Sequence, residues 1–382
     1  MKALRIALLT LLVVLPCAPL SAQGLWQRFV LWLREGDQFD SSYIYQHPVR
    51  FQVSLDGALQ RVSVDLKSGF DMTCYEHDNE GNVTATAQVP STITSNMSEN
   101  INGGFGMGLG YGKLGLGFGL FTWPANAATT TSLNFGYQGH KWGIRVSAYR
   151  ISQYARNTMT IDTLGTTQWH TVSESQTSNP CAVGRLNVDA YWTIRRNRFA
   201  YTAAYKCDMV QRRSAGSLMI CAGMLLSALE HQQGDAILML SDFKGYRNFQ
   251  SSVGAGYSHN IVFVHHDPTG PHDKGLFNIT LNLTILPMLT VYSNLTAVPW
   301  SESDNVRITG QLAPTVTFGG ALGFTIGRVF FGTQYRHNLY YFRSASAMSA
   351  ADLGIEGSGI DNVGVEGLFQ DWRLSTIVVV NF

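Results

Sequence analysis

Large apolar residues and glycine alternate with a period of two in the first third of this chain. Phe105, Met107, Leu109 and Tyr111 alternate with four glycines, and Leu114, Leu116, Phe118 and Leu120 then alternate with three more. Because successive side chains of a strand point to opposite faces, this stretch has one apolar face and one almost bare face. A soluble sheet rarely places glycine on its core face, since glycine weakens strands. The pattern favours a barrel wall that meets lipid outside and is crowded or curved inside.

The same glycines could instead belong to a phosphate-binding loop. Such a loop needs a strand, a tight glycine turn and then a helix. No helical pattern follows here, and the glycines keep alternating, so we favour the strand interpretation.

Strand-like runs recur along the chain, and the only stretch of helical period is short. We predict strands near 49–56, 60–70, 84–97, 101–111, 113–122, 131–139, 141–154, 183–195, 197–208, 216–230, 248–264, 276–290, 308–325, 328–343 and 370–382. Some of the early runs can belong to one bent strand. Transmembrane strands need about 9–11 residues and single-chain bacterial barrels have an even strand number. The sequence therefore predicts an all-β fold, a closed antiparallel transmembrane β-barrel of about 12–14 strands.

The two ends of the chain fit a secreted barrel. Residues 1–22 have the charged, apolar and cleavage regions of a signal peptide. Residues 23–47 form a periplasmic segment with helical spacing near 25–35, interpreted as a short amphipathic helix or a loosely ordered N-terminus. Residues 48–382 form the barrel domain. The terminal Phe382 ends a β-branched run, which is typical of the assembly signal of outer-membrane barrels, although a buried strand of a soluble sandwich could also end this way.

Loop lengths give a conflicting topology. If Phe382 lies at the periplasmic rim, the connection 344–369 is extracellular, yet counting strands backwards places 155–182 on the periplasmic side. Long loops of bacterial barrels usually lie outside. We therefore expect one miscounted strand between 183 and 290, with 231–264 as the main suspect.

Composition narrows the class further. Charged residues are 14% of the chain and the net charge is +1, where soluble domains carry about 25% charged residues. Nucleic-acid binders need a basic surplus, which is missing here. Aromatic residues gather near predicted strand ends, as in the interfacial girdles of membrane barrels, with core packing as the alternative for each: Phe121, Trp123, Trp142, Tyr340, Tyr341, Phe342 and Trp372.

Four segments carry a resemblance to a known family: DSSYIYQHP (40–48), INGGFGMGLGYGKLGLGFGLF (101–121), LNVDAYWTIRRNRFAYTAAYK (186–206) and QRRSAGSLMICAG (211–223). In order and spacing the chain resembles an uncharacterised family of predicted outer-membrane β-barrels from Bacteroidetes, a domain-of-unknown-function family. The most specific parts are the turn at 196–201 and the segment 211–217. The resemblance implies a location in the outer membrane of a Gram-negative cell, and it carries no catalytic residue across.

Candidate chemistry is sparse. A histidine and aspartate cluster matches no known metal spacing, and its prolines and glycine indicate a turn: His265, His266, Asp267, His272 and Asp273. Ser258 and His259 are the residue types of a hydrolase, but neighbours on a strand face opposite ways, and nothing ties His337 to Ser344. Two basic turns could bind lipid phosphate or lie at the interface: Arg195, Arg196 and Arg198, then Arg212 and Arg213.

Four cysteines remain after removal of the signal: Cys74, Cys181, Cys207 and Cys221. Cys207 and Cys221 are symmetric about Ser214 in an expected hairpin. Opposed residues of such a hairpin come close enough for a disulfide with slight adjustment, so we consider this pair and two free thiols as alternatives.

The sequence predicts an outer-membrane barrel for passive permeation, surface contact or envelope structure, with no catalytic residues, cofactor or metal. Its expected partners are outer-membrane lipid and lipopolysaccharide, with the barrel-assembly machinery and periplasmic chaperones during biogenesis, and no nucleic acid. An outer-membrane hydrolase acting on lipid, or a secreted soluble β-sandwich binding protein, are the alternatives.

Overall fold

The structure is a computed structural model that describes residues 39–48, 51–98, 101–124, 129–139, 141–154, 157–163, 172–174, 181–206, 208–230, 243–270, 273–299, 305–349 and 360–382. Residues Phe39–Phe382 form one compact unit. The signal segment 1–22 and the helix expected near 25–35 lie outside the described residues. In the part of the chain that is described, no helix has the length and apolar character needed to cross a membrane.

Strands make up most of the described chain. They are β1 (Ile44–Gln46), β2 (Phe51–His77), β3 (Val83–Ser98), β4 (Asn102–Tyr111), β5 (Leu114–Trp123), β6 (Thr129–Gln138), β7 (Trp142–Tyr154), β8 (Asn157–Thr163), β9 (Val172–Glu174), β10 (Cys181–Thr193), β11 (Met209–Gln211), β12 (Ala215–Glu230), β13 (Phe243–His266), β14 (Phe277–Pro299), β15 (Val306–Thr309), β16 (Ala313–Ile326), β17 (Val329–Arg343) and β18 (Ile360–Asn381). One 3-10 helix, η1 (Tyr201–Ala204), interrupts the described series. The prediction of an all-β chain with a large antiparallel sheet is confirmed.

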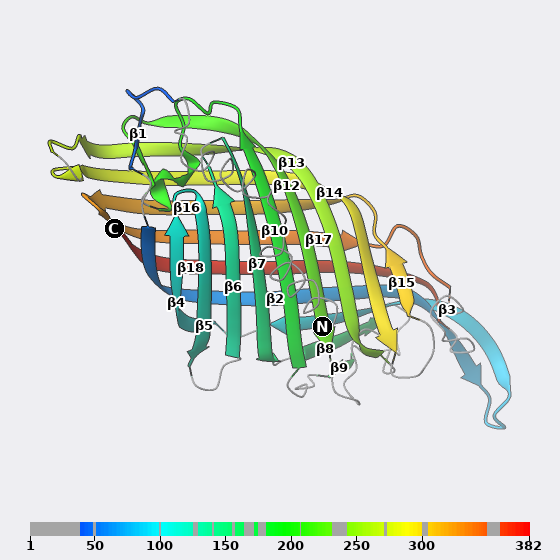
Figure 1. The fold of residues 1–382 in the computed structure, drawn as a ribbon. Helices are drawn as coiled ribbons and strands as arrows, with labels where there is room; N and C mark the ends of the chain where they lie inside the picture. The colour runs from blue at the N-terminus through cyan, green and yellow to red at the C-terminus, as the bar shows by residue number, and fades with distance from the viewer. Residues whose placement is uncertain are drawn as a thin grey trace, which may run out of the picture. The chain divides into compact units, whose positions relative to one another are not determined.

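Twelve of the described strands hydrogen-bond in a cyclic order. The order runs β2, β4, β5, β6, β7, β10, β12, β13, β14, β16, β17 and β18, and β18 pairs again with β2. Figure 1 shows β4 to β10 crossing in front of β16, β17, β18 and β2. Because each of these twelve strands has a partner on both sides, none of them leaves a free edge along its whole length.

β3 and β4 lie end to end along one edge of β2. β4 pairs with Phe51–Gln60 and β3 pairs with Ser63–His77. The runs predicted at 49–56 and 60–70 are both parts of β2, so the expectation that early runs share one strand is confirmed. The β2–β3 hairpin projects beyond the other strands (Figure 1), and the far edge of β3 is extended by β8 and then β9.

The connections between strands divide into two groups at opposite ends of the sheet. We call the end that holds Gly112, the Gly327 turn and Phe382 the turn end, and the opposite end, where β2 passes to β3, the loop end. Phe382 donates its backbone N–H to the carbonyl of Phe51 at 2.9 Å. Short turns join β4 to β5, β6 to β7 and β16 to β17 at the turn end.

The strand predicted over 197–208 is wrong, and this error explains the conflicting topology. Residues 201–204 form η1, and turns precede it. Phe199, Ala200, Ala203 and Ala204 are all buried, a spacing that strand alternation cannot produce. Without this strand in the count, the strands that flank 155–180 end at the loop end, together with those that flank 344–359. Of the suspected region 231–264, the described part 243–264 is not the source, since it lies within the single strand β13.

The faces of the sheet are the reverse of those of a soluble protein. Outward side chains are large, apolar and exposed, with Phe105 at 82%, Met107 at 62% and Leu55 at 60%. Inward side chains of the sheet are polar and buried, among them Gln52 of β2, Asn187 of β10 and Asn282 of β14. The period-two pattern therefore has the apolar face outside, as the glycine alternation predicted.

β2 shows where this reversal stops. Up to Leu59 its outward residues are apolar, but Arg61 and Lys67 are exposed beyond that point. Its inward residues change in the opposite sense, from Gln52 and Gln60 to a run of apolar residues that begins at Val62. We call the region of outward apolar residues that ends at this level the apolar band. Beyond it, β2 has the ordinary pattern of a strand in water.

The aromatic residues near strand ends divide between the two faces. Trp123 and Tyr341 are exposed outward, whereas Phe121, Tyr340 and Phe342 are buried inside. The girdle interpretation is therefore wrong for the three buried rings. Side chains alternate between the two faces up to the end of a strand, so the adjacent rings of Tyr340, Tyr341 and Phe342 point to opposite faces in turn.

Candidate functional site

A small two-stranded sheet and η1 pack inside the turn end. β1 pairs antiparallel with β11 from Ile44↔Gln211 to Gln46↔Met209. Ile44, Met209, Ala200 and Ala203 pack in one cluster with Phe39 and Tyr43 at its margin. We call residues 39–48 and 195–213 together the plug. Two segments that are about 150 residues apart in sequence therefore pack together as one unit.

Gln211 is the centre of the hydrogen bonds that hold the plug together. Its buried side-chain amide donates to the carbonyls of Tyr43 at 3.2 Å, Arg198 at 2.8 Å and Arg213 at 2.9 Å. Its side-chain oxygen accepts from the backbone N–H of Ala200 at 2.9 Å. A single side chain thereby satisfies backbone groups of both segments, which would be costly to leave unpaired when buried.

Inward asparagines of β13 and β14 attach the plug to the wall. Asn260 donates to the Ala200 carbonyl at 2.7 Å and to Gln211 Oε1 at 3.1 Å. Asn278 donates to the Gln211 carbonyl at 2.8 Å. Asn282 donates to Asn260 at 2.7 Å and accepts from the Tyr205 hydroxyl at 2.9 Å. These polar groups bind the plug, so their burial on the inner face is compensated.

Three arginines of the two basic turns contact the plug's first segment. Arg198 forms an ion pair with Asp40 at 3.3 Å and stacks on Tyr43, and Arg213 lies over the same ring. Arg212 lies over Tyr45 and pairs with Asp267 at 2.6 Å. The sequence interpretation of these residues as interfacial or lipid-binding groups missed these contacts.

Carboxylates at the turn end complete this attachment. The hydrogen bond with His265, and next the charge of Arg212, hold the pKa of the Asp267 carboxyl below its ordinary value. Hydrogen bonds from Ser42, and next the charge of Arg198, hold the pKa of the Asp40 carboxyl low. Both groups are therefore anionic at neutral pH, where they attract the arginines of the plug.

The loop end of the interior is filled by apolar side chains beyond the apolar band. Nine strands and the 344–349 segment contribute to one buried cluster, which we call the apolar seal: Val62, Val64, Leu66, Phe70, Ile151, Val183, Leu225, Leu229, Tyr246, Leu295, Ile308, Tyr340, Phe342, Met348, Val363, Val365 and Phe369. Each fully buried side chain of this size stabilises the fold by roughly 1.5–3 kcal/mol relative to exposure. The cluster is a packed apolar core on the inner face of the sheet at this end.

A layer of ion pairs lies next to the apolar seal. Arg336 pairs with Asp189 at 2.7 Å, Arg185 pairs with Asp371 at 2.6 Å, and Arg373 pairs with Asp56. Asn338 joins two of these pairs, because it donates to Asp371 at 2.7 Å and accepts from Arg336 at 3.1 Å. Buried charges are tolerated when they are paired and hydrogen-bonded in this way.

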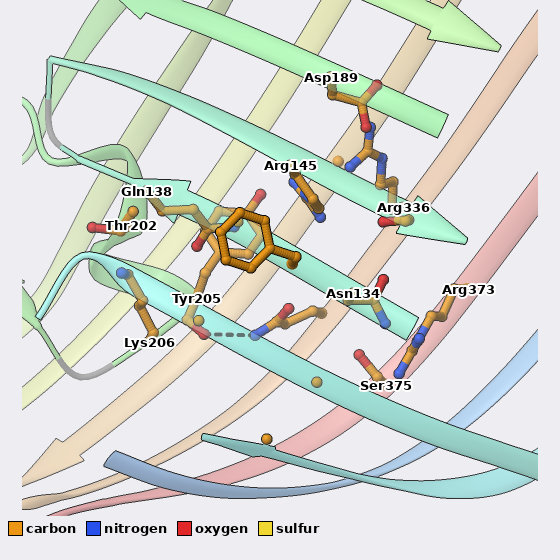
Figure 2. A pocket seen from close by; sticks show the side chains of 18 of the residues that line it. Asn134, Gln138, Arg145, Asp189, Thr202, Tyr205, Lys206, Arg336, Arg373 and Ser375 are labelled. Atoms are coloured by element: carbon orange, nitrogen blue, oxygen red, sulfur yellow. Dashed lines mark hydrogen bonds and ion pairs between the residues drawn. The ribbon is translucent and has the colours of Figure 1, made fainter. Parts of the chain in front are cut away.

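A cavity of about 330 Å³ lies between this layer and the plug. Figure 2 shows Arg336 beside Asp189, with Arg145, Asn134 and Tyr205 around the same space. We call it the chamber. Its wall on the β4 and β5 side includes the inward glycines Gly108, Gly110, Gly115 and Gly117. A Cβ on Gly108 would lie 2.5 Å from Ser54 Oγ.

The candidate enzyme and metal residues do not converge. Ser258 is buried inside and bonds Thr284 at 2.6 Å, whereas His259 lies on the other face and contacts Tyr257. The Ser344 hydroxyl accepts a hydrogen bond from the Val365 backbone N–H at 3.1 Å, and among the described residues it makes no contact with His337. Within the described ranges, no group of three or more histidine, cysteine, aspartate or glutamate side chains is placed to hold a metal ion.

The histidine and aspartate turn is divided between the sheet and the plug. His265 contacts Asp267 at 2.9 Å, and Asp273 contacts the buried His47 at 3.2 Å and also accepts from Tyr45. His272 lies outside the described residues. The carboxylate of Asp273 therefore anchors β1, a role that spacing along the chain does not reveal.

The disulfide expected between Cys207 and Cys221 stays a prediction, because Cys207 lies outside the described residues. The hairpin on which this expectation rested is not present within the described ranges, however. Cys221 is buried on β12, whose partners are β10 and β13, so β12 forms no hairpin with residues 197–208. Cys221 lies directly opposite Tyr191 and Gly254. The side chains of Cys74 and Cys181 are also outside the described part.

The fold and its interior define a class of protein: a large antiparallel sheet in cyclic order, apolar outside and polar inside, with a plug at one end. The chain belongs to the family of the domain of unknown function DUF4421, whose family model matches residues 74–354. No curated protein matches the sequence. Membership confirms the domain-of-unknown-function part of the resemblance, and the Bacteroidetes origin stays a prediction.

Three solved structures of other proteins are similar at a low level. The outer membrane protease OmpT from Escherichia coli has a TM-score of 0.34 at 7% identity, over 86% of this chain and 97% of its own. A FadL homologue from Pseudomonas aeruginosa has a TM-score of 0.20 at 9% identity, over 87% and 90%. The toluene transporter TodX from P. putida has a TM-score of 0.19 at 9% identity, over 88% and 91%. Similarity of this degree carries no argument about the activity of this chain.

Proposed function

We propose that this chain is a closed transmembrane β-barrel of a Gram-negative outer membrane. The observation that carries the proposal is the reversal of faces within the apolar band. Leu55 and Phe105 are outward and exposed, whereas Gln52 and Asn282 are inward and buried. Monomeric soluble proteins rarely expose contiguous apolar surface of more than a few hundred Å². In lipid, by contrast, a strand ring must pair all its backbone groups, which the cyclic order allows.

Strand lengths support the same proposal. β4, β5 and β6 have 10 residues each, which is the length that a tilted strand needs to cross a bilayer. The 27 residues of β2 exceed that length, and its excess lies where the face pattern changes at Arg61. The turn end would then face the periplasm, and the loop end would face outward, in agreement with the usual distribution of loop lengths.

We propose further that the barrel serves envelope structure or contact at the cell surface rather than passive permeation. The apolar seal occupies the interior at the loop end, and the plug occupies the turn end. A solute channel needs a continuous polar path, and packed side chains such as Phe369 and Phe342 stand across it. Outer-membrane lipid and lipopolysaccharide would surround the band, and the assembly machinery would recognise Phe382.

Membrane insertion can be tested on the mature chain. We expect the protein to stay with membranes during carbonate washing and to migrate faster on gels before boiling than after it. A soluble β-sandwich would be released by carbonate and would show no heat-dependent mobility. Release by carbonate would contradict the barrel proposal.

Closure of the interior can be tested by single-channel recording in planar bilayers, with a general porin as the positive control. We expect no discrete conductance from the mature protein. A variant without residues 23–48, which lacks β1 of the plug, should also be silent because the apolar seal remains. Discrete openings of the intact protein would contradict the structural role, and openings of the variant alone would assign closure to the plug.

A further inference from the structure

The chamber between the ion-pair layer and the plug is a candidate binding site. Its volume of about 330 Å³ lies at the lower end of the range of small-molecule pockets. Five basic and three acidic side chains line it. The charge of a ligand that fits the chamber therefore depends on which of these side chains already form ion pairs within the protein.

Every carboxylate that lines the chamber is matched by an arginine. Asp56 pairs with Arg373, Asp189 with Arg336, and Asp371 with Arg185. Among the basic residues, Lys206 also has a carboxylate, that of Asp208 at 3.0 Å. The lining thus offers no unmatched negative charge to a cation among the described residues.

Arg145 differs from the other two arginines of the chamber. It lies on the inner face of β7, between Gly143 and Ser147, and lines the chamber. Its Nε atom is buried and has no hydrogen-bond partner among the described residues, and no carboxylate there forms an ion pair with it. A buried donor of a charged group without a partner costs free energy, which an anionic ligand would recover.

We propose that the chamber binds a small oxyanion, a carboxylate or phosphate compound, with Arg145 as the principal ligand. A planar guanidinium matches the two oxygens of a carboxylate or phosphate group. The side-chain amides of Asn134 and Gln138 and the hydroxyls of Tyr201 and Thr202 also line the chamber. They supply neutral donors for the remaining oxygens of the ligand.

The glycine wall makes room for the ligand. A Cβ on Gly115 would meet no atom within 4 Å, and one on Gly117 would make only contacts of 3.7 Å or more. Both residues line the chamber. The chamber also includes Lys113 of the β4–β5 turn and Gln138 at the end of β6, so it reaches the turn end beside the plug. Access would come from that end.

The test is isothermal titration of the refolded full-length mature protein in detergent at low ionic strength, with inorganic phosphate and with succinate. We expect saturable binding of at least one of them at one site. Arg145→Gln should weaken binding roughly tenfold or more, the loss expected for a charge-assisted contact. Arg145→Lys, which keeps the charge, should retain part of the affinity.

Two further variants separate binding from folding. Arg150→Gln lies on the same strand but on the exposed outer face, so it should bind as the wild type does. Gly115→Leu keeps every charge, its Cβ would meet no atom within 4 Å, and its side chain would take up part of the chamber, so it should weaken binding. The heat-dependent gel mobility of each variant reports whether it is folded.

Absence of binding of both anions to the folded wild type at millimolar concentration would overturn the proposal. So would equal affinities of the wild type and Arg145→Gln. Phosphate binding without succinate binding would assign a phosphate compound, and the reverse result would assign a carboxylate. The barrel proposal is tested separately by carbonate washing, so failure of one leaves the other standing.

Discussion

At the scale of single residues, the inward glycines of β4 and β5 have unequal roles. Gly104 faces backbone atoms of β5, since a Cβ there would overlap the Leu120 carbonyl oxygen and the Phe121 Cα. Gly115, on the same inner face, has open space. The sequence predicted one bare face for both strands, but alternation alone cannot rank these positions, because the space around each depends on strands that are distant in sequence.

This difference gives a matched pair of substitutions. Gly104→Ala should destabilise the protein by about 1–3 kcal/mol, the usual result of overpacking against atoms that cannot move aside. Gly115→Ala should change stability by less than about 0.5 kcal/mol, as open positions do. Urea titration of the refolded proteins, followed by gel mobility, would measure both. Equal effects of the two substitutions would contradict the geometry of the inner face.

At the scale of elements, the plug shows what a pattern along the chain can miss. The segments 40–48, 186–206 and 211–223 were recognised as distinctive in sequence. Their meeting depends on Gln211 and on the asparagines of β13 and β14, which are distant in sequence. Alternation with apolar residues marks Asn278 and Asn282 as inward, but it does not show what they bind. The sequence predicts a strand over 197–208, but consecutive residues of this run are buried, Phe199 with Ala200 and Ala203 with Ala204, and this packing overrides a strand-like pattern.

Gln211 should therefore matter more than any other single side chain that holds η1. Gln211→Ala would leave the Ala200 N–H and three carbonyls without this partner, at a cost of about 1–3 kcal/mol for each buried group that water cannot reach. We expect proteolysis within 195–213, while the strands of the sheet remain resistant.

Gln334→Ala is the control for this experiment. Gln334 also holds the plug, but through one hydrogen bond, to the Tyr205 carbonyl at 2.8 Å. Its loss should leave the plug resistant to protease. Cleavage at equal rates in the two variants would show that Gln211 is not the centre of the attachment.

At the scale of the whole molecule, two environments meet at Arg61 of β2. On the turn-end side the outward residues are apolar, and on the loop-end side the strand follows the rules of a protein in water. Leu55 and Val83 have similar exposure, 60% and 53%, but Val83 lies in the β2–β3 hairpin beyond the band. In a membrane barrel, Leu55 would contact lipid and Val83 would contact water. In a soluble protein, both side chains would contact water.

If Leu55 lies near the middle of the bilayer, Leu55→Arg should make the free energy of membrane insertion less favourable by about 2–4 kcal/mol. Val83→Arg should be tolerated, since its side chain is in water in both cases. Refolding yields in lipid vesicles, read from heat-dependent mobility, would measure the difference. Equal tolerance of the two arginines would place Leu55 in water and contradict the membrane band.

The sequence by itself determined that the chain is all-β with a large antiparallel sheet, and it determined the direction of the faces. Period-two alternation over Gly104–Leu120 and the other runs is a local property, because each side chain's face follows from its neighbours along one strand. Only the tertiary structure decided which strands are real, how the interior is closed, and where an unmatched charge remains. The apolar seal draws on strands from β2 to β18, the plug joins residues 39–48 to 195–213, and Arg145 stands apart only after Asp56, Asp189 and Asp371 have found their partners. Contacts between residues so far apart in sequence leave no periodic trace, since they are set by strand register around the whole sheet.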